Sequence, residues 1–284
     1  MFSNGLTEAD NLKIFDTHAH YDDEKFASED VDKLLSEMFK GNIAAITGAA
    51  VNLATSAKQI EFAEKHPEFY AAVGIHPENI YDEGEIGDTL SRLEKLLHHP
   101  KVVAIGEIGL DYYWEQNPPR EIQKEWFRAQ LELAQKTGFP VIIHDREAHG
   151  DIFDILTEYK NINGVLHSCS ASRETVAELL KRGFYVSFSG VITYKNATRL
   201  ADVVRSVPSD RILVETDCPY LSPVPMRGKT NRSEYVEYTL RKAAEIRGED
   251  PEKLSVQTTE NAMRLFGIEK IGENPIKPAK FEQK

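Results

Sequence analysis

Two histidines one residue apart are the first sign of chemistry in this sequence. His18 and His20 stand in the segment FDTHAHYDDEKF, residues 15–26. Side chains at positions i and i+2 point to the same face of a β-strand, so both imidazoles would project together. Such a pair could chelate a metal ion, or the two rings could be hydrogen-bonded histidines of a core. The pair alone leaves both interpretations open.

Further side chains of the metal-ligand type lie near the C-terminal ends of apolar runs. With the first pair they make a set of six: His18, His20, Glu107, His144, His167 and Asp217. Four histidines and two carboxylates in equivalent positions are hard to explain as unrelated core residues, so a metal site is predicted. Nitrogen and oxygen donors together suit zinc, manganese, cobalt or nickel better than calcium, and magnesium stays a candidate. Because a catalytic zinc site usually has three protein ligands, six ligands predict two divalent ions, with Glu107 as the bridge.

The apolar runs and the segments between them form a repeating pattern. Short runs rich in Val, Ile and Ala alternate with stretches of helical periodicity, as in a parallel sheet with crossover helices. The runs cover residues 13–20, 42–50, 69–77, 102–110, 140–146, 163–170, 184–192 and 211–218, and the clearest helices cover 119–137, 172–182 and 233–247. Eight such repeats without a composition break predict an α/β fold, a single (β/α)8 TIM barrel, with the metal site at its C-terminal mouth. The barrel is expected over residues 1–267 and an irregular tail over 268–284.

The sequence lacks the signals of a nucleotide-binding fold, of a membrane span and of secretion. No G-x-G-x-x-G motif follows the first run and no P-loop motif occurs, which argues against a doubly wound nucleotide-binding fold. No apolar run approaches the roughly 20 residues of a membrane span. Residues 1–13 lack the basic and apolar regions of a secretory signal. We therefore expect a cytoplasmic protein without a membrane partner.

Charge constrains the partners only weakly. A net charge of −12 argues against a broad basic surface for duplex nucleic acid. Two bound cations would nevertheless reverse the potential within one cleft while the outer surface stays acidic. Nothing in the pattern indicates an oligomeric state.

Six segments, five of which contain the candidate ligands, resemble, in order, the signature segments of the TatD-type metal-dependent deoxyribonucleases. They are DTHAHYDD (16–23), VGIHP (73–77), IGEIGLDYY (105–113), VIIHDREA (141–148), VLHSCSAS (165–172) and VETDCPYLSPVPMRGKTNR (214–232). The resemblance extends over about residues 13–267. It implies a barrel of the amidohydrolase superfamily that holds two divalent ions and hydrolyses phosphodiesters, usually as an exonuclease on DNA.

The resemblance also implies a division of the ligands between the two ions. It makes His18, His20 and Asp217 ligands of one ion, His144 and His167 ligands of the other, and Glu107 the ligand that they share. The sequence departs from the family pattern at residues 168–171, where the family commonly has Cys-Phe-Ser-Gly after the histidine. It departs again at residues 231–233, where the family usually has Asn-x-Pro. Neither departure removes a ligand.

The expected activity is divalent-metal-dependent cleavage of DNA, at chain ends or in single strands. Asp217 would both bind a metal ion and accept a proton from the attacking water, with Glu107 as the second catalytic residue. His76, Arg146 and Arg227 are the candidate substrate-binding residues.

Two other classes of function stay open. One is amidohydrolase-type hydrolysis of an amide, a lactone or an aminoacyl ester; many such relatives bridge their ions with a carboxylated lysine in the fourth strand. Residues 102–110 contain no lysine, which favours the nuclease. The other is a metal-binding scaffold without catalysis, for which six ligands would be more than binding needs.

Overall fold

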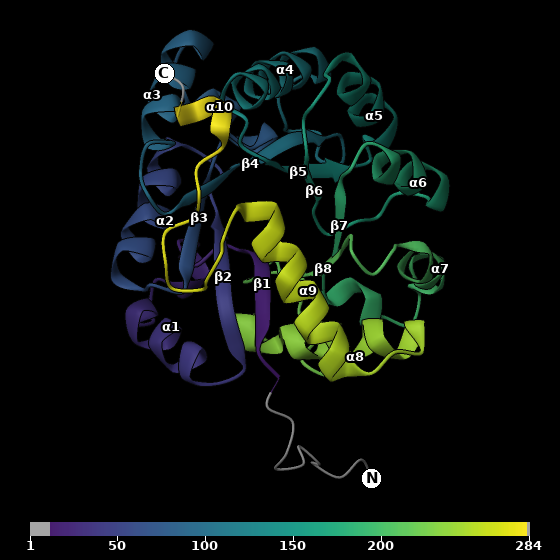
Figure 1. Ribbon diagram of the computed structural model, residues 1–284. Coiled ribbons are helices and arrows are strands. Elements are labelled where there is room, and N and C mark those ends of the chain that lie inside the picture. The colour runs from purple at the N-terminus through teal and green to yellow at the C-terminus, as the bar shows by residue number, and fades with distance from the viewer. Residues whose placement is uncertain (1–11, 283–284) are drawn as a thin grey trace.

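The computed structural model describes residues 12–282, and its eight strands form one parallel sheet in the order of the chain (Figure 1). The strands are β1 (Ile14–Ala19), β2 (Ile43–Ala49), β3 (Phe69–Val73), β4 (Val102–Asp111), β5 (Val141–Arg146), β6 (Gly164–Leu166), β7 (Tyr185–Phe188) and β8 (Ile212–Val214). Each lies within or overlaps one of the eight apolar runs. The sheet curls round until the segment after β8 meets β1, where the amide of His20 donates to the carbonyl oxygen of Cys218 at 2.7 Å. The predicted TIM barrel is therefore confirmed.

Helices cover the outside of the barrel between successive strands (Figure 1). They are α1 (Val31–Lys40), α2 (Leu53–Lys65), α3 (Ile86–Leu96), α4 (Arg120–Thr137), α5 (His149–Glu158), α6 (Arg173–Lys181), α7 (Thr198–Ser206), α8 (Val236–Arg247), α9 (Pro251–Phe266) and α10 (Ala279–Glu282). Short 3-10 helices cover Glu24–Phe26, Pro77–Asp82, Gly190–Thr193 and Ser233–Tyr235. The helices expected at 119–137 and 172–182 are α4 and α6, and the one expected at 233–247 is a 3-10 turn that leads into α8.

Four of the expected strands end four residues before their apolar runs do. The runs 69–77, 163–170, 184–192 and 211–218 contain the shorter strands β3, β6, β7 and β8. Ser168 and Asp217 have φ values of 39° and 57°, in the left-handed region that a strand does not use. The residues beyond these strands are largely buried all the same, so the apolar pattern reports burial at the mouth rather than strand length.

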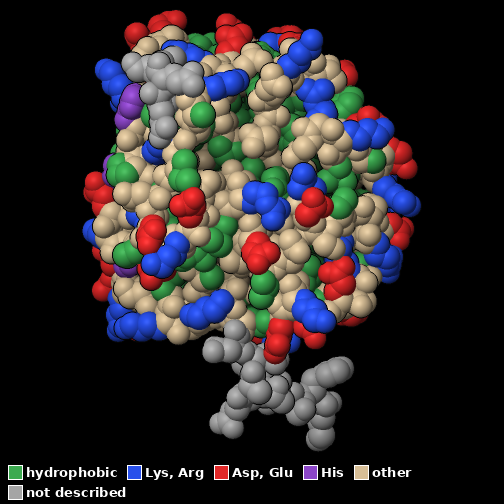
Figure 2. Space-filling model, viewed as in Figure 1, with side chains coloured by type: hydrophobic (Ala, Val, Ile, Leu, Met, Phe, Trp, Pro, Cys, Tyr) green, Lys and Arg blue, Asp and Glu red, His purple; other side chains and the backbone are tan. Residues whose placement is uncertain are grey.

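Helix α9 occupies residues that the expected elements left unassigned. It begins at Pro251 after the cap Asp250, whose side chain accepts from two backbone amides, and it ends at Gly267, whose φ is 67°. The helix crosses the near end of the barrel in Figure 1, and its Phe266 packs against Phe15 with ring centroids 6.0 Å apart. Its apolar residues thus close the N-terminal end of the barrel. Figure 2 shows this end as a surface where Lys and Arg are interspersed with Asp and Glu.

The C-terminal segment after α9 follows the same end of the barrel. Ile276 donates its amide to the carbonyl oxygen of Gly267, and the ammonium of Lys277 donates to the carbonyl oxygens of His99 and Val102 at 2.6 and 2.8 Å. Only the short helix α10 interrupts its irregular course within the described residues. Residues 1–11, on which the expected location mostly rests, and the last two residues of the tail lie outside the described part of the chain.

Within residues 12–282, no helix combines the length and the apolar character that crossing a bilayer requires.

Asp16 ties the first strand to the last turn of the barrel. Its carboxylate, which is fully buried, accepts from the amide of Thr216 at 2.9 Å and from the hydroxyl of Thr216 at 2.6 Å. We expect Asp16→Ala to lower the free energy of unfolding by about 2 kcal/mol, because both donors would be left unpaired in the core. Urea unfolding followed by circular dichroism measures this, with the exposed mid-helix variant Asp154→Ala as the control. Equal unfolding midpoints for the two variants would contradict a role for Asp16 in barrel closure.

Candidate metal centre

The barrel brings all six expected ligands to its C-terminal end, opposite α9. Strand β1 carries His18 and is followed at once by His20, β4 carries Glu107, β5 carries His144, and the loops after β6 and β8 carry His167 and Asp217. All six side chains line or lie directly beside one cavity, and their exposed fractions are 15% or less. The spatial convergence that the sequence predicts is therefore present.

Glu107 lies at the centre of this cluster and faces two separate groups of imidazoles. Its Oε2 is 3.1 Å from His18 Nε2 and 3.5 Å from His20 Nε2. Its Oε1 is 2.6 Å from His144 Nδ1 and 2.8 Å from His167 Nε2. One carboxylate oxygen thus points to each pair of rings, which is the arrangement of a carboxylate that bridges two cations.

Asp217 completes the first group. Its Oδ1 lies 3.4 Å from His20 Nε2 and 3.7 Å from His18 Nε2, and the two Nε2 atoms are 3.0 Å apart. Donors that share one ion at about 2.1 Å are roughly 3.0–3.4 Å from each other in tetrahedral or octahedral geometry. Two of the three spacings lie in this range, and the third, between His18 Nε2 and Asp217 Oδ1, is longer at 3.7 Å. The three donors are thus close to the arrangement that a single divalent cation needs.

The outer nitrogens of two of these rings are fixed by acceptors. His20 Nδ1 lies 2.9 Å from the carbonyl oxygen of Ala49, and His144 Nε2 lies 3.0 Å from Asp111 Oδ2. Because each outer nitrogen donates a proton there, the inner nitrogen is the one that has a lone pair once the ring is neutral. Burial lowers the pKa of both rings, but the neighbouring carboxylates raise it to about 9, so each inner nitrogen must lose its proton to bind a metal. Metal-binding histidines are held in this way, so the rings present are suited to a metal.

Glu215 fixes the outer nitrogen of a third ring, that of His167. Its Oε1 accepts from His167 Nδ1 at 3.1 Å and from the backbone amide of Ser168 at 2.7 Å, while its Oε2 has no hydrogen-bond partner among the described residues. The carboxylate is completely buried. His167 therefore presents Nε2 to Glu107, and Glu215 keeps it there.

A glycine allows the two central strands to approach each other beside the cluster. Gly109 pairs with His144 across β4 and β5, and its φ is +149°. A Cβ at this position would lie 2.0 Å from the carbonyl oxygen of His144. Glycine is therefore required for β4 and β5 to hold Glu107 and His144 in contact.

The imidazoles determine the charge state of the central carboxylate. Burial raises the pKa of Glu107, but His167, His18, His76 and His144 together hold it well below its usual range. Glu107 is therefore an anion at neutral pH and can serve as a metal ligand without first losing a proton.

His76 occupies a different position from the six expected ligands. It caps the 3-10 helix Pro77–Asp82, and its Nδ1 accepts from the amide of Glu78 at 3.2 Å. Burial lowers the pKa of His76 to about 3, so the ring is neutral and its proton is on Nε2, 3.7 Å from Glu107 Oε1. His76 thus presents a donor toward the cluster, which suits contact with a substrate better than metal binding.

The cluster opens into a cavity of about 700 Å³. Of the three expected substrate-binding residues, His76 and Arg146 line this cavity. Arg227 is not among the lining residues, and its guanidinium carbon lies 4.1 Å from the ring centroid of Tyr194.

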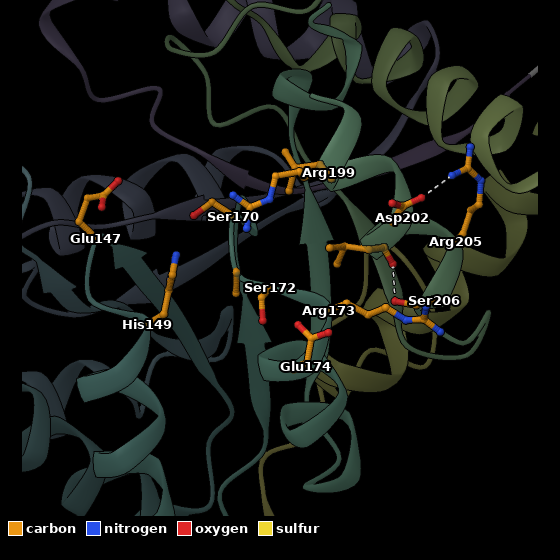
Figure 3. A pocket seen from close by; sticks show the side chains of 13 residues that line it. Glu147, His149, Ser170, Ser172, Arg173, Glu174, Arg199, Asp202, Arg205 and Ser206 are labelled. Carbon is orange, nitrogen blue, oxygen red and sulfur yellow. Dashed lines mark hydrogen bonds and ion pairs between the residues drawn. The ribbon is translucent and has the colours of Figure 1, made fainter. Parts of the chain in front are cut away.

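A second cavity, of about 770 Å³, adjoins the first and shares Ser170 and Leu200 with it. Figure 3 shows its walls: Arg199 extends from α7 toward Ser170, while Arg205 turns toward Asp202, with which it forms an ion pair at 2.8 Å. Arg173 and Arg199 make no ion pair within residues 12–282. The second cavity therefore has two guanidinium groups outside ion pairs, and the carboxylates of Glu147, Glu174 and Asp202 line it as well.

The sequence analysis did not include Glu215 or Asp111 among the candidate site residues. Each carboxylate accepts from a histidine of the candidate ligand set. For Glu215 a signal was present, because it stands two residues before Asp217 at the end of an apolar run. For Asp111 the signal was its position at the C-terminal end of β4, which is the criterion that selected the six candidate ligands.

A family model described as TatD related DNase matches residues 15–267. The chain belongs to the TatD family of metal-dependent hydrolases. The family predicted from the sequence is thereby confirmed, and the TatD match spans β1 to the end of α9.

TatD relatives match nearly the whole chain. The uncharacterized metal-dependent hydrolase YabD of Bacillus subtilis (strain 168) is 40% identical over 257 residues, which is 90% of this chain and 99% of YabD. The 3′-5′ ssDNA/RNA exonuclease TatD of Enterobacter lignolyticus (strain SCF1) is 32% identical, and the match covers 90% of this chain and 99% of that one. The crystal structure of YJJV, a TatD homologue from Escherichia coli K12, matches with a TM-score of 0.82 and 29% identity, over 89% of this chain and 97% of YJJV.

Glu215 offers a test of the TatD cluster that leaves every ligand in place. We expect Glu215→Gln to weaken metal binding by about 10- to 100-fold, because the neutral amide holds the His167 ring less firmly. Titration against a chelator of known affinity measures this. The exposed variant Glu85→Gln serves as the control. An unchanged metal affinity in Glu215→Gln would show that Glu215 does not support the cluster.

Proposed function

We propose that the chain hydrolyses phosphodiester bonds at the ends of nucleic acid strands, with two divalent cations bound at the cluster. The observation that carries this proposal is the division of Glu107 between two pairs of imidazoles. A site with one ion would not need a second pair of nitrogens on the far oxygen of the same carboxylate. The name of the Enterobacter relative as an exonuclease supports the choice of nucleic acid as substrate.

The residues present fit the two cations. His18, His20 and Asp217 would hold one ion, His144 and His167 would hold the other, and Glu107 would bind both. When bound, the two cations would activate a water and offset the negative charge of the phosphodiester. The mixed nitrogen and oxygen donors suit zinc, manganese, nickel or cobalt, with magnesium as a further candidate.

Asp217 is the group that we assign to proton transfer. It lines the cavity, and its side chain is 15% exposed, so a water can reach it. Burial raises its pKa, but the hydrogen bond from His20 and the nearby charged rings lower it below the usual value. The carboxylate is therefore ionised at neutral pH and can accept a proton from the attacking water.

The cavity wall provides the contacts for the substrate. His76 presents its Nε2 proton to an oxygen of the phosphodiester. Arg146 contributes positive charge at the rim, and Arg227 lies farther along the mouth, over Tyr194. Arg173 and Arg199 in the second cavity would contact phosphates of the strand beyond the cleaved bond. Locally placed cations of this kind compensate for the net charge of −12.

Hydrolysis of an amide, a lactone or an aminoacyl ester is the second candidate function. A hydrolytic metal cluster of this composition could polarise a carbonyl oxygen as well as a phosphoryl oxygen. The described β4 carries Glu107 and no lysine, so a carboxylated lysine cannot be the bridge in this strand.

The test is restoration of cleavage by added metal. Metal-stripped protein is incubated with end-labelled single-stranded and double-stranded oligonucleotides, and magnesium, manganese or zinc is added in turn. We expect a ladder that grows from one end, that depends on metal, and that is absent in Glu107→Ala but present in the control Glu85→Ala. Turnover of amides or esters without any cleavage of oligonucleotides would replace the proposal by the second candidate. Metal-loaded protein that acts on neither would indicate a binding scaffold.

A further inference from the structure

Two large aromatic side chains stand exposed at the edge of the metal cavity, in the loop between β4 and α4. Tyr113 is 52% exposed and Trp114 is 43% exposed. Their ring centroids are 4.7 Å apart at an interplanar angle of 85°. The guanidinium carbon of Arg146, from the end of β5, lies 4.1 Å from the centroid of Tyr113 and 5.3 Å from that of Trp114. We call these three residues the aromatic platform.

The platform is not explained by packing. Aromatic rings of this size normally bury most of their surface, yet both rings are open to solvent. Arg146 makes no side-chain hydrogen bond or ion pair with any residue in the described part of the chain. Trp114 and Arg146 both line the cavity that contains the metal cluster. Exposed aromatic surface and a guanidinium without an ion-pair partner among the described residues thus meet beside the cluster.

The platform is also held at a fixed position relative to the cluster. Asp111 Oδ1 accepts from the backbone amide of Tyr113 at 2.9 Å, and Asp111 Oδ2 lies 3.0 Å from His144 Nε2. One carboxylate therefore orients both a ligating histidine and the first ring of the platform. A substrate group bound at the cluster would find the rings at a set distance.

We propose that the aromatic platform stacks an unpaired nucleobase next to the phosphodiester bound at the metal centre. This inference rests on the proposed function and specifies its substrate as a strand whose terminal bases are unpaired. Every base offers a π-face, and aromatic rings with an adjacent arginine bind such faces with little dependence on base identity. A base inside a duplex is covered by its stacked neighbours and would have to be extruded first.

Two tyrosine rings near the cluster already have a cation over one face. The guanidinium carbon of Arg146 lies 4.1 Å from the ring centroid of Tyr113, and the ammonium of Lys25 lies 3.9 Å from that of Tyr220, whose hydroxyl donates to Asp23 at 2.6 Å. Trp114 is in contrast an exposed indole that lines the cavity beside the cluster. This makes Trp114 the residue at which stacking is best tested.

Tryptophan fluorescence can report stacking directly. The chain has two tryptophans, and Trp126 is only 5% exposed in α4, so solution contacts act mainly on Trp114. Metal-loaded protein is mixed by stopped flow with a single-stranded oligonucleotide or with an abasic strand of the same length, and emission is recorded before cleavage. We expect quenching by the oligonucleotide and little quenching by the abasic strand. Equal quenching by both strands, or by neither, would overturn the proposal.

Substitutions at Trp114 separate stacking from phosphate binding. We expect Trp114→Ala to raise the KM for single-stranded oligonucleotides by roughly 5- to 150-fold, the range found for loss of one stacked base. Trp114→Phe should restore most of the affinity, and Tyr81→Ala, which removes a 64% exposed ring that does not line the cavity, should change nothing. The same KM in Trp114→Ala as in the unaltered protein would overturn the proposal while leaving the nuclease intact. Base-dependent quenching without any cleavage would instead uphold the platform and reject the nuclease.

Discussion

Replacement of Glu107 by glutamine should empty the metal centre and abolish activity. The amide keeps the volume of the carboxylate but loses its charge, and it can no longer offer an anionic oxygen to each of the two pairs of imidazoles. Loss of an outer-shell partner typically costs 10- to 100-fold in metal affinity or activity, so loss of the shared ligand should lower the turnover number by about 10³-fold or more.

The measurement is metal content by elemental analysis together with the rate on end-labelled oligonucleotides. Far-ultraviolet circular dichroism shows whether Glu107→Gln keeps the barrel, and Glu85→Gln controls for the loss of one negative charge near the mouth. If Glu107→Gln retained two equivalents of metal and near-normal turnover, Glu107 would not be the bridge.

Asp217→Asn should separate proton transfer from metal binding. The asparagine side chain cannot accept a proton from water, so we expect the turnover number to fall by about 10²- to 10⁴-fold. The other five donors stay in place, so most of the bound metal should remain and the KM should change little. Steady-state kinetics and elemental analysis on the same preparation measure the two effects.

The control for this variant is Asp210→Asn, an exposed aspartate in the segment that leads into β8. Parallel loss of metal and activity in Asp217→Asn would assign Asp217 a ligand role alone. A variant with unchanged turnover would exclude Asp217 from the reaction.

The six candidate ligands could be selected from the sequence because each interrupts or ends an apolar run. His144 shows this well: three apolar residues of β5 precede it, and an imidazole is unexpected at that point of a buried strand. Parallel strands then bring such residues to one end of the barrel, whatever their separation along the chain. The topology of the barrel could be predicted from the number and the order of the strand–helix repeats alone.

The supporting carboxylates were harder to predict, because their role depends on how the backbone turns after a strand. Glu215 reaches the His167 ring from the segment between the end of β8 and Asp217, whose φ is 57°. From the sequence alone, Asp111 could equally well be a turn residue, because aspartate is common in turns. The aromatic platform likewise depends on a loop that places Trp114 beside Arg146, and this proximity has no sequence signature.

The closure of the N-terminal end by α9 restricts the route by which a substrate could enter the barrel and a product could leave it. If the proposed function holds, a strand end would reach Glu107 through the C-terminal mouth, because in the described part of the chain Phe266 and its neighbours in α9 cover the other end. A released nucleotide would then have to leave past the strand that is still bound, or the strand would first have to withdraw. Repeated cleavage of one strand would therefore require the strand to be repositioned at the same opening after each cut.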